Sequence, residues 1–316
     1  MKILVTGAAG FIGSHLCEAL IKEHEVIGID NFCDFYDIKI KRNNIKGLAQ
    51  FDNFQIIKAD IRSNGDLDEI FNHHKFDMVI HLAAMAGVRP SIADPVLYTE
   101  VNINGTVNLL QQCKEHGIKK FIFASSSSVY GNNKKVPFAE IDPVDLPISP
   151  YAATKKAGEL ICHTYHHLEK ISMICLRFFT VYGPRQRPDL AIHKFARKIL
   201  ADEDIPVFGD GSTKRDYTYI DDIIDGILRA IEFVNNNYCY EIINLGESQT
   251  ISLSKMIQTI ENALGKKARK DSHPLQPGDV DQTFADISKA KKMLGYDPNT
   301  NFEAGIDKFI AWLSDN

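Results

Sequence analysis

The first half of the chain alternates short apolar runs with stretches in which apolar residues recur at helical spacing. The apolar runs are rich in β-branched residues and have the length of buried strands. They are Lys2–Thr6, Glu25–Ile29, Phe54–Ala59, Asp77–Leu82, Lys119–Ser125 and Ser172–Phe178. Helical patterns begin at Phe11 and near residues 66–74, 101–116 and 150–170. This alternation of strands and helices predicts an α/β fold with a doubly wound parallel sheet.

Beyond Phe178 the pattern changes, because prolines and glycines divide the chain into shorter pieces. Helical patterns return near residues 189–202, 221–234, 252–264 and 302–314. We predict a smaller mixed α/β lobe over the carboxyl ends of the strands, where ligands bind in such sheets. The expected division is residues 1–178 for the sheet domain and mainly 179–316 for the smaller lobe. The helix near 221–234 is expected to return to the first domain.

Composition excludes several classes of protein. The 316 residues are 44% apolar and 24% charged, which is ordinary for a globular protein. A net charge of −5 without basic runs argues against nucleic-acid binding. No apolar run has the length of a membrane span, and no signal peptide precedes the first strand. The cysteines are scattered without a CxxC pair, so we expect reduced thiols, a cytoplasmic protein and no structural metal.

The turn after the first strand has the features of a dinucleotide site. Gly7, Gly10 and Gly13 follow Thr6 and open a helix, whose N-terminus suits a pyrophosphate. The second strand ends at Asp30, whose carboxylate can accept both hydroxyls of an adenosine ribose and would repel a 2′-phosphate. The sequence therefore predicts a Rossmann-type domain that binds NAD in preference to NADP.

A second set of residues points to proton transfer. Tyr151 and Lys155 stand four residues apart, at the start of a helix that Ser149 caps and Pro150 opens. A tyrosine base near neutrality needs its pKa lowered by about 3 units, roughly 4 kcal/mol. A nearby ammonium and a nicotinamide cation can stabilise the phenolate. The serine run 125–128 ends a strand and supplies hydroxyls for a substrate oxygen, although spacing does not choose among the four serines.

With these residues in view, the chain resembles the extended short-chain dehydrogenases/reductases, and among them the nucleotide-sugar 4-epimerases. The likeness runs nearly end to end. It rests on the segments 7–13 (GAAGFIG), 30–31 (DN), 60–61 (DI), 81–89 (HLAAMAGVR), 125–131 (SSSSVYG), 151–155 (YAATK), 177–184 (RFFTVYGP) and 215–217 (RDY). Each motif alone is weak, but the combination is specific.

The resemblance implies a role for each matching position. NAD would be held by Gly7, Gly10, Phe11, Ile12, Gly13, Asp30, Asn31, Asp60, Ile61, Leu82, Ala83, Ala84, Tyr151 and Lys155, with Asp60 and Ile61 beside the adenine. The catalytic residues would be Ser126, Tyr151 and Lys155. The UDP-sugar would be bound by Arg89, Ser127, Ser128, Thr180, Arg185, Arg187, Val207, Phe208, Arg215, Asp279 and Thr283. Of these, Val207 and Phe208 would flank the uracil, while Arg215 and Asp279 would hold the diphosphate and ribose.

The implied reaction is an internal redox cycle. Tyr151 would take the proton of the sugar's 4-hydroxyl while C4 delivers hydride to NAD, and the transient 4-keto sugar would turn over before hydride returns. Relatives that are 4,6-dehydratases carry an Asp-Glu pair where this chain has Ser127 and Ser128, and related uronate decarboxylases carry a glutamate at the position of Ser128. The sequence therefore argues against both a 4,6-dehydratase and a uronate decarboxylase. A non-catalytic dinucleotide-binding protein also remains open, although such proteins typically lose the tyrosine–lysine pair.

The identity of the sugar stays open at this level. Thr283 stands where the family has a gate beside the C2 substituent, and its small side chain leaves room for an N-acetyl group. Ser127, Ser128, Thr180 and Arg187 could instead receive a uronate carboxylate. We favour UDP-N-acetylglucosamine slightly over UDP-glucuronate, with UDP-glucose as a further alternative.

The resemblance also implies a homodimer that pairs through the helices near 101–116 and 150–170. The apolar side chains available for such an interface are Leu109, Leu110, Leu160, Ile161 and Leu168. Part of this apolar surface must cover the sheet, so the sequence leaves the contact face undetermined.

Overall fold

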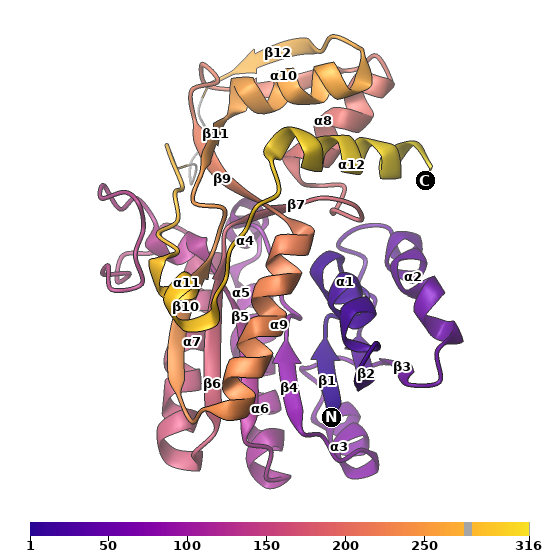
Figure 1. Cartoon of the computed structure of the whole chain (residues 1–316), viewed down its shortest axis with the longest axis vertical. Helices are drawn as coiled ribbons and strands as arrows, with labels where there is room; N and C mark the ends of the chain where they lie inside the picture. The colour runs from indigo at the N-terminus through magenta and orange to yellow at the C-terminus, as the bar shows by residue number, and fades with distance from the viewer. Residues whose placement is uncertain (275–279, 316) are drawn as a thin grey trace.

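The computed structural model describes residues 1–274 and 280–315 and is built around a seven-stranded sheet (Figure 1). The strand order is β10-β6-β5-β4-β1-β2-β3, and every neighbouring pair is parallel. Their bounds are β1 Lys2–Thr6, β2 Glu25–Asp30, β3 Phe54–Lys58, β4 Met78–His81, β5 Lys120–Ser126, β6 Ser172–Phe178 and β10 Tyr240–Leu245. The order reverses between β1 and β4, which opens a crevice at the carboxyl ends of these strands.

Alternate residues of each strand face opposite sides of the sheet, and both sides are buried. In β5, Ile122 and Ala124 join one apolar cluster while Phe121 and Phe123 join the other. In β1, Ile3 and Val5 are likewise separated from Leu4. Burial on both faces explains why these strands read as continuous apolar runs in the sequence.

Helices cover the two faces of the sheet, as Figure 1 shows. One face carries α1 (Phe11–Leu20) and α9 (Ile220–Asn236); the other carries α3 (Asn64–His73), α6 (Gly105–Glu115) and α7 (Pro150–Glu169). The predicted helix over 101–116 is divided, because a π-helix at Glu100–Asn104 precedes α6. The shorter helices α2 (Ile38–Lys46), α4 (Val88–Ala93) and α5 (Pro95–Thr99), together with the 3₁₀ turns at Gly47–Gln50 and Ser127–Tyr130, complete this half.

The smaller lobe lies over the carboxyl ends of the strands (Figure 1). It has a three-stranded mixed sheet and a two-stranded parallel sheet. The strands are β7 Thr180–Tyr182, β8 Asp204–Phe208, β9 Lys214–Tyr219, β11 Thr250–Ser252 and β12 Arg269–His273. Around them lie α8 Ala191–Leu200, α10 Leu253–Leu264 and α12 Phe302–Ser314, while α11 Ser288–Leu294 lies beside β10.

Two elements from the second half of the chain belong to the large sheet. Helix α9 packs on β5 and β6, and β10 then pairs in parallel with β6 at the edge. The sequence pattern did not predict β10, because a long helix and a polar stretch, 235–238, separate it from the earlier strands. The division into domains at residue 178 therefore stays a prediction, with chain 220–245 lying against the first half.

Across the residues that the structure describes, no helix combines the length and apolar character that crossing a membrane would need.

Candidate active site

A cavity of about 540 Å³ opens at the carboxyl ends of β1, β2, β4 and β5 and is closed from above by the smaller lobe. Most of the residues predicted for the site line it. These are Gly7, Gly10, Phe11, Ile12, Gly13, Asp30, Asn31, Asp60, Ile61, Leu82, Ala83, Ala84, Ser126, Ser127, Ser128, Tyr151, Lys155, Thr180, Arg187, Arg215 and Thr283. These residues lie far apart in the sequence. The parallel sheet brings those of the first half to the carboxyl ends of its strands, and the smaller lobe supplies Thr180, Arg187, Arg215 and Thr283.

The glycines of the first turn are required by close backbone contacts. Gly7 has φ +71°, and a Cβ there would lie 2.9 Å from Cα and N of Ala83. A Cβ on Gly13 would lie 2.1 Å from the carbonyl oxygen of Gly7. Gly10 is the N-cap of α1 and brings no side chain, so the first N–H groups of this helix can face an anion.

Asp30 is buried at the end of β2 and is held in place by backbone donors. Its Oδ1 accepts from Phe32 N at 2.8 Å and its Oδ2 from Ala9 N at 3.2 Å. Burial raises the pKa of this carboxyl, and the ammonium of Lys41, 3.8 Å from Oδ1, opposes that rise. Lys41 also lines the cavity and donates to Cys33 O at 2.9 Å. The sequence analysis missed Lys41 because α2 was not predicted.

Asp60 stands on the neighbouring loop and is firmly ionised. Hydrogen bonds from Arg62, at 2.8 and 3.0 Å, are the largest influence on its pKa and lower it to about 2. Asn31 donates to the same carboxylate at 3.0 Å. Asn31 and Asp60, which follow β2 and β3, thus form one polar wall of the predicted cofactor half of the cavity.

A buried histidine lies beneath the cavity wall formed by Leu82, Ala83 and Ala84. His81 Nε2 lies 3.0 Å from Thr106 Oγ1, which itself donates to Asn102 O, so Nε2 carries the proton. Nδ1 then accepts from Thr6 Oγ1 at 2.7 Å, and the same hydroxyl accepts from Ala83 N. Burial lowers the pKa of His81 to about 3, which keeps the ring neutral. His81 therefore orients the Leu82–Ala84 strand end, a role that its place in the recognised motif did not reveal.

Tyr151 and Lys155 lie on the first turns of α7, where the Ser149 hydroxyl accepts from Ala152 N at 3.1 Å. Lys155 Nζ donates to Ala124 O at 2.7 Å and lies 6.0 Å from the ring centroid of Tyr151. Burial lowers the pKa of Lys155 to about 8. Burial raises the pKa of Tyr151, whereas a hydrogen bond with Ser126 and the charge of Arg187 lower it.

The four serines have different environments. Ser125 donates to Glu159 Oε1 at 2.7 Å and is turned away into a buried ion pair. Ser126 accepts from Ser128 N and bonds to Tyr151. Ser128 Oγ is buried at the cavity wall and has no hydrogen-bond partner among the described residues. This geometry favours Ser126 as the partner of Tyr151, and it leaves Ser128 available to a ligand.

The other end of the cavity carries a half-buried arginine. Arg187 forms a bidentate pair with Asp189, through Nε–Oδ1 at 2.9 Å and Nη2–Oδ2 at 2.7 Å. Its guanidinium also lies 5.2 Å from the ring centroid of Phe35. Thr283 Oγ1 accepts from Asp216 N at 3.1 Å, which ties this small side chain to the backbone. Arg187 therefore offers its Nη1 edge, outside the Asp189 pair, to a ligand.

Four predicted substrate residues do not line this cavity among the described residues. Arg185 Nη2 pairs with Glu18 of α1 at 2.6 Å and so joins the loop to a helix, while its predicted role in substrate binding stays a prediction. Arg89 lies over the ring of Phe208 at 4.8 Å, and His273 contacts the same ring. Val207 is buried beneath them in β8. Asp279 lies outside the described residues.

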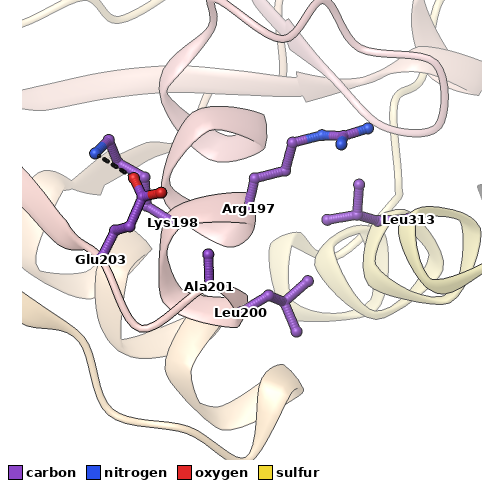
Figure 2. A pocket seen from close by; sticks show the side chains of 6 residues that line it. All are labelled: Arg197, Lys198, Leu200, Ala201, Glu203 and Leu313. Atoms are coloured by element: carbon purple, nitrogen blue, oxygen red, sulfur yellow. Dashed lines mark hydrogen bonds and ion pairs between the residues drawn. The ribbon is translucent and has the colours of Figure 1, made fainter.

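A second cavity, about 480 Å³, lies between α8 and α12 (Figure 2). Its walls are Arg197, Lys198, Leu200, Ala201, Glu203 and Leu313, so it is separate from the predicted site. Within residues 1–274 and 280–315, no group of three or more His, Cys, Asp or Glu side chains is placed to hold a metal ion.

Comparison with known proteins gives consistent matches over nearly the whole chain. The family described as GDP-mannose 4,6 dehydratase matches residues 4–309. A UDP-glucuronate 4-epimerase from Thermodesulfobacterium geofontis is 44% identical over 315 residues, covering 99% of this chain and 96% of that protein.

Solved structures of UDP-sugar 4-epimerases also match nearly the whole chain. UDP-glucuronic acid 4-epimerase from Bacillus cereus, in complex with UDP-glucuronic acid and NAD, is 43% identical with a TM-score of 0.94 and covers 100% of this chain and 99% of that chain. UDP-N-acetylglucosamine 4-epimerase from Methanobrevibacter ruminantium M1, in complex with UDP-N-acetylmuramic acid, is 32% identical with a TM-score of 0.90, covering 99% and 98%.

Proposed function

Because the chain belongs to the NAD-dependent epimerase/dehydratase family of extended short-chain dehydrogenases/reductases, we propose that it is a UDP-glucuronate 4-epimerase. The coarser activity follows from the family and its relatives: the chain is an NAD-dependent UDP-sugar 4-epimerase, and so an isomerase. The finer choice of sugar is the proposal. Inversion at C4 of UDP-glucuronate would produce UDP-galacturonate.

The relatives favour UDP-glucuronate over UDP-N-acetylglucosamine, the sugar slightly preferred from the sequence. The two UDP-glucuronate enzymes described above are 43% and 44% identical to this chain, against 32% for the N-acetylglucosamine enzyme. The small side chain of Thr283, on which that preference rested, is compatible with either sugar, because an unfilled space at C2 does not exclude a hydroxyl there.

The observation that carries the proposal is the position of Arg187 in the cavity. Its guanidinium is close enough to Tyr151 for its charge to lower the pKa of the phenol. Thr180 and the hydroxyl of Ser128 line the same cavity. A cation with hydroxyl donors beside it suits a carboxylate at C6, and a neutral hydroxymethyl group would leave that charge without a partner from the substrate.

The chain's own residues can perform the proton transfer. Tyr151 would accept the proton of the 4-hydroxyl, Ser126 would hold the same oxygen, and the Lys155 ammonium would favour the phenolate. When bound, NAD would supply hydride acceptance from C4 and return to the opposite face, and a nicotinamide cation would stabilise the Tyr151 phenolate. The cofactor is regenerated in each turnover, so none is consumed.

The test is incubation of the purified protein with UDP-glucuronate, UDP-N-acetylglucosamine and UDP-glucose in separate samples, followed by NMR. We expect conversion of UDP-glucuronate to be the fastest without added NAD. Slow conversion that added NAD restores would indicate a looser cofactor. Faster conversion of either other sugar would overturn the proposed substrate.

Two variants separate the candidate sugars. Arg187→Ala should lower kcat/KM for UDP-glucuronate. The expected rise in the corresponding activation free energy is about 1.5–3 kcal/mol, the range for a hydrogen bond to a charged group. The same substitution should affect UDP-glucose much less. Thr283→Tyr should selectively lower turnover of UDP-N-acetylglucosamine if the side chain at position 283 limits the space beside the C2 substituent. Equal losses on all three sugars in Arg187→Ala would remove the carboxylate contact from the proposal.

A further inference from the structure

Backbone and side-chain hydrogen bonds hold the segment that carries Arg187. Gln186 N donates to Gly183 O at 3.1 Å, Gln186 Nε2 donates to Val181 O at 3.1 Å, and Leu190 N donates to Arg187 O at 3.2 Å. Arg185 takes φ +62°, a left-handed conformation that costs free energy in a residue with a side chain. Strained backbone of this kind persists only where its surroundings over-determine it.

One of those contacts comes from a buried histidine that the proposed reaction does not use. His193 on α8 is fully buried, and its Nδ1 bonds to Gln186 O, the carbonyl of the peptide that precedes Arg187. Its Nε2 accepts from Arg197 Nε at 2.7 Å. A carbonyl can only accept and a guanidinium can only donate, so these partners select the neutral ring with its proton on Nδ1. Burial lowers the pKa of His193, in agreement with a neutral ring.

The far side of the ring is fixed by α12. The ring centroids of Phe309 and Trp312 lie 5.6 and 5.8 Å from that of His193, both in edge-on geometry. Figure 2 shows Arg197 extending from α8 toward Leu313 of α12. The imidazole thus lies between α8, α12 and the Gln186 peptide, with little freedom to rotate.

We propose that His193 is a positioning residue, which orients the Gln186–Arg187 peptide so that the Arg187 guanidinium faces the sugar end of the cavity. Without this bond the Gln186–Arg187 peptide loses one of the contacts that fix it, and the position of the guanidinium relative to Tyr151 becomes less well defined. An error of about 1 Å in a binding group can cost roughly a hundredfold in rate. The proposal rests on the proposed function in that Arg187 is taken to contact the sugar.

Two substitutions separate the hydrogen bond from the packing. His193→Phe keeps the aromatic contacts with Phe309 and Trp312 and removes the bond to Gln186 O. His193→Asn removes most of the ring contacts but places an amide N–H where Nδ1 stood. We therefore expect His193→Phe to unfold near the wild-type temperature and His193→Asn to unfold at a lower one. Lys194→Ala, an exposed neighbour on α8, is the matched control.

The decisive measurement is substrate discrimination, taken with Arg187→Ala as the reference. For whichever UDP-sugar depends most on Arg187, His193→Phe should lower kcat/KM by roughly tenfold or more, mainly through KM. His193→Asn should stay close to wild type. The double variant Arg187→Ala/His193→Phe should be no worse than Arg187→Ala alone, because both changes remove the same interaction.

The outcomes are distinguishable. If wild-type protein prefers another sugar to UDP-glucuronate, the proposed function fails, and His193 is still tested on the sugar that Arg187 selects. If His193→Phe lowers kcat/KM equally for all three UDP-sugars, His193 does not act through Arg187. The same conclusion follows if its effect adds fully to that of Arg187→Ala. If His193→Asn loses discrimination as His193→Phe does, the hydrogen bond is not the cause. Each of these last three results overturns the inference.

Discussion

At the scale of single residues, burial controls the charge of the groups around the cavity. It raises the pKa values of Asp30 and Tyr151 and lowers those of Lys155 and His81. In each case the charged form is disfavoured by loss of water. The charges of Lys41 and Arg187 oppose the rise in pKa at Asp30 and Tyr151, respectively.

Tyr151→Phe tests the proposed base. The change removes the ionisable oxygen and keeps the ring, so UDP-sugar binding should survive. Turnover should fall by roughly 10²–10⁴-fold, the usual loss for a general base. Calorimetric binding measured beside the NMR assay of conversion would separate the two effects, and near-normal turnover would show that another residue moves the proton.

Asp30→Ala tests cofactor choice. Loss of the carboxylate should weaken NAD, because a charged hydrogen-bonding group contributes about 1.5–3 kcal/mol. It should also relax discrimination against NADP, since the Lys41 ammonium, 3.8 Å from the carboxylate, would remain. Binding titrations with both dinucleotides give the ratio. Wild-type protein that binds NADP as tightly as NAD would contradict the role of Asp30.

Glu247 gives a prediction on pH. Burial, with Asp222 and Asp216 nearby, raises its pKa to about 8, and its buried Oε2 has no hydrogen-bond partner among the described residues. The folded protein thus holds this proton up to higher pH than the unfolded chain, so the free energy of unfolding should fall between about pH 4.5 and pH 8. Urea titrations of Glu247→Gln should lack this part of the fall and give a more stable protein at pH 9. An unchanged pH profile would reject the assignment.

At the scale of elements, α7 is joined to the sheet by a buried ion pair one turn beyond Lys155. Arg177 of β6 donates to Glu159 at 2.8 and 2.9 Å, and both side chains are almost fully buried. Ser125 of β5 donates to the same carboxylate. These contacts fix the distance between the helix that carries Tyr151 and the strand that carries Ser126.

Breaking this pair on one side should be costly. Arg177→Met leaves the buried Glu159 carboxylate with only Ser125 and, at 3.6 Å, Lys156 as partners. Removing one side of a buried ion pair typically costs about 3–5 kcal/mol. The double variant Arg177→Met/Glu159→Leu removes both charges and should recover much of that loss. Denaturant titrations of the wild type, Arg177→Met, Glu159→Leu and the double variant test this. A double variant as unstable as the two single changes combined would contradict it.

At the scale of the whole molecule, the cavity depends on contact between the two halves of the chain. α1 packs against α9, and Arg185 joins the loop after β7 to Glu18 of α1. The cofactor end and the sugar end are thereby held in one frame. The outer face of α7 is different, because Leu160 and Leu168 are 59% and 67% exposed.

This face bears on the predicted homodimer. Leu109 and Leu110 of α6 are fully buried against the sheet, and Ile161 is partly buried, so the apolar contact left on α7 is Leu160 with Leu168. Replacing both with glutamate should shift a dimer toward monomer at micromolar concentration, because two charges would be buried at the interface. Light scattering gives the mass. A monomeric wild-type protein would count against the prediction.

The sequence by itself determined the features that depend on local spacing. The β1–Gly7–α1 turn, Asp30 at the end of β2, and Tyr151 with Lys155 on a capped helix all follow from patterns within a few residues. Here backbone period and turn chemistry set which side chains share a face. The doubly wound sheet follows in the same way from the alternation of strands and helices.

Only the tertiary structure decided the features that depend on distant contacts. The hydroxyl of Ser125 bonds to Glu159, which Arg177 also holds, and the guanidinium of Arg185 bonds to Glu18 of α1. Arg187, two residues later, points inward because Asp189 and Phe35 hold it. In an irregular loop no period links residue number to direction, so side-chain direction is set by packing partners that lie far away in the sequence.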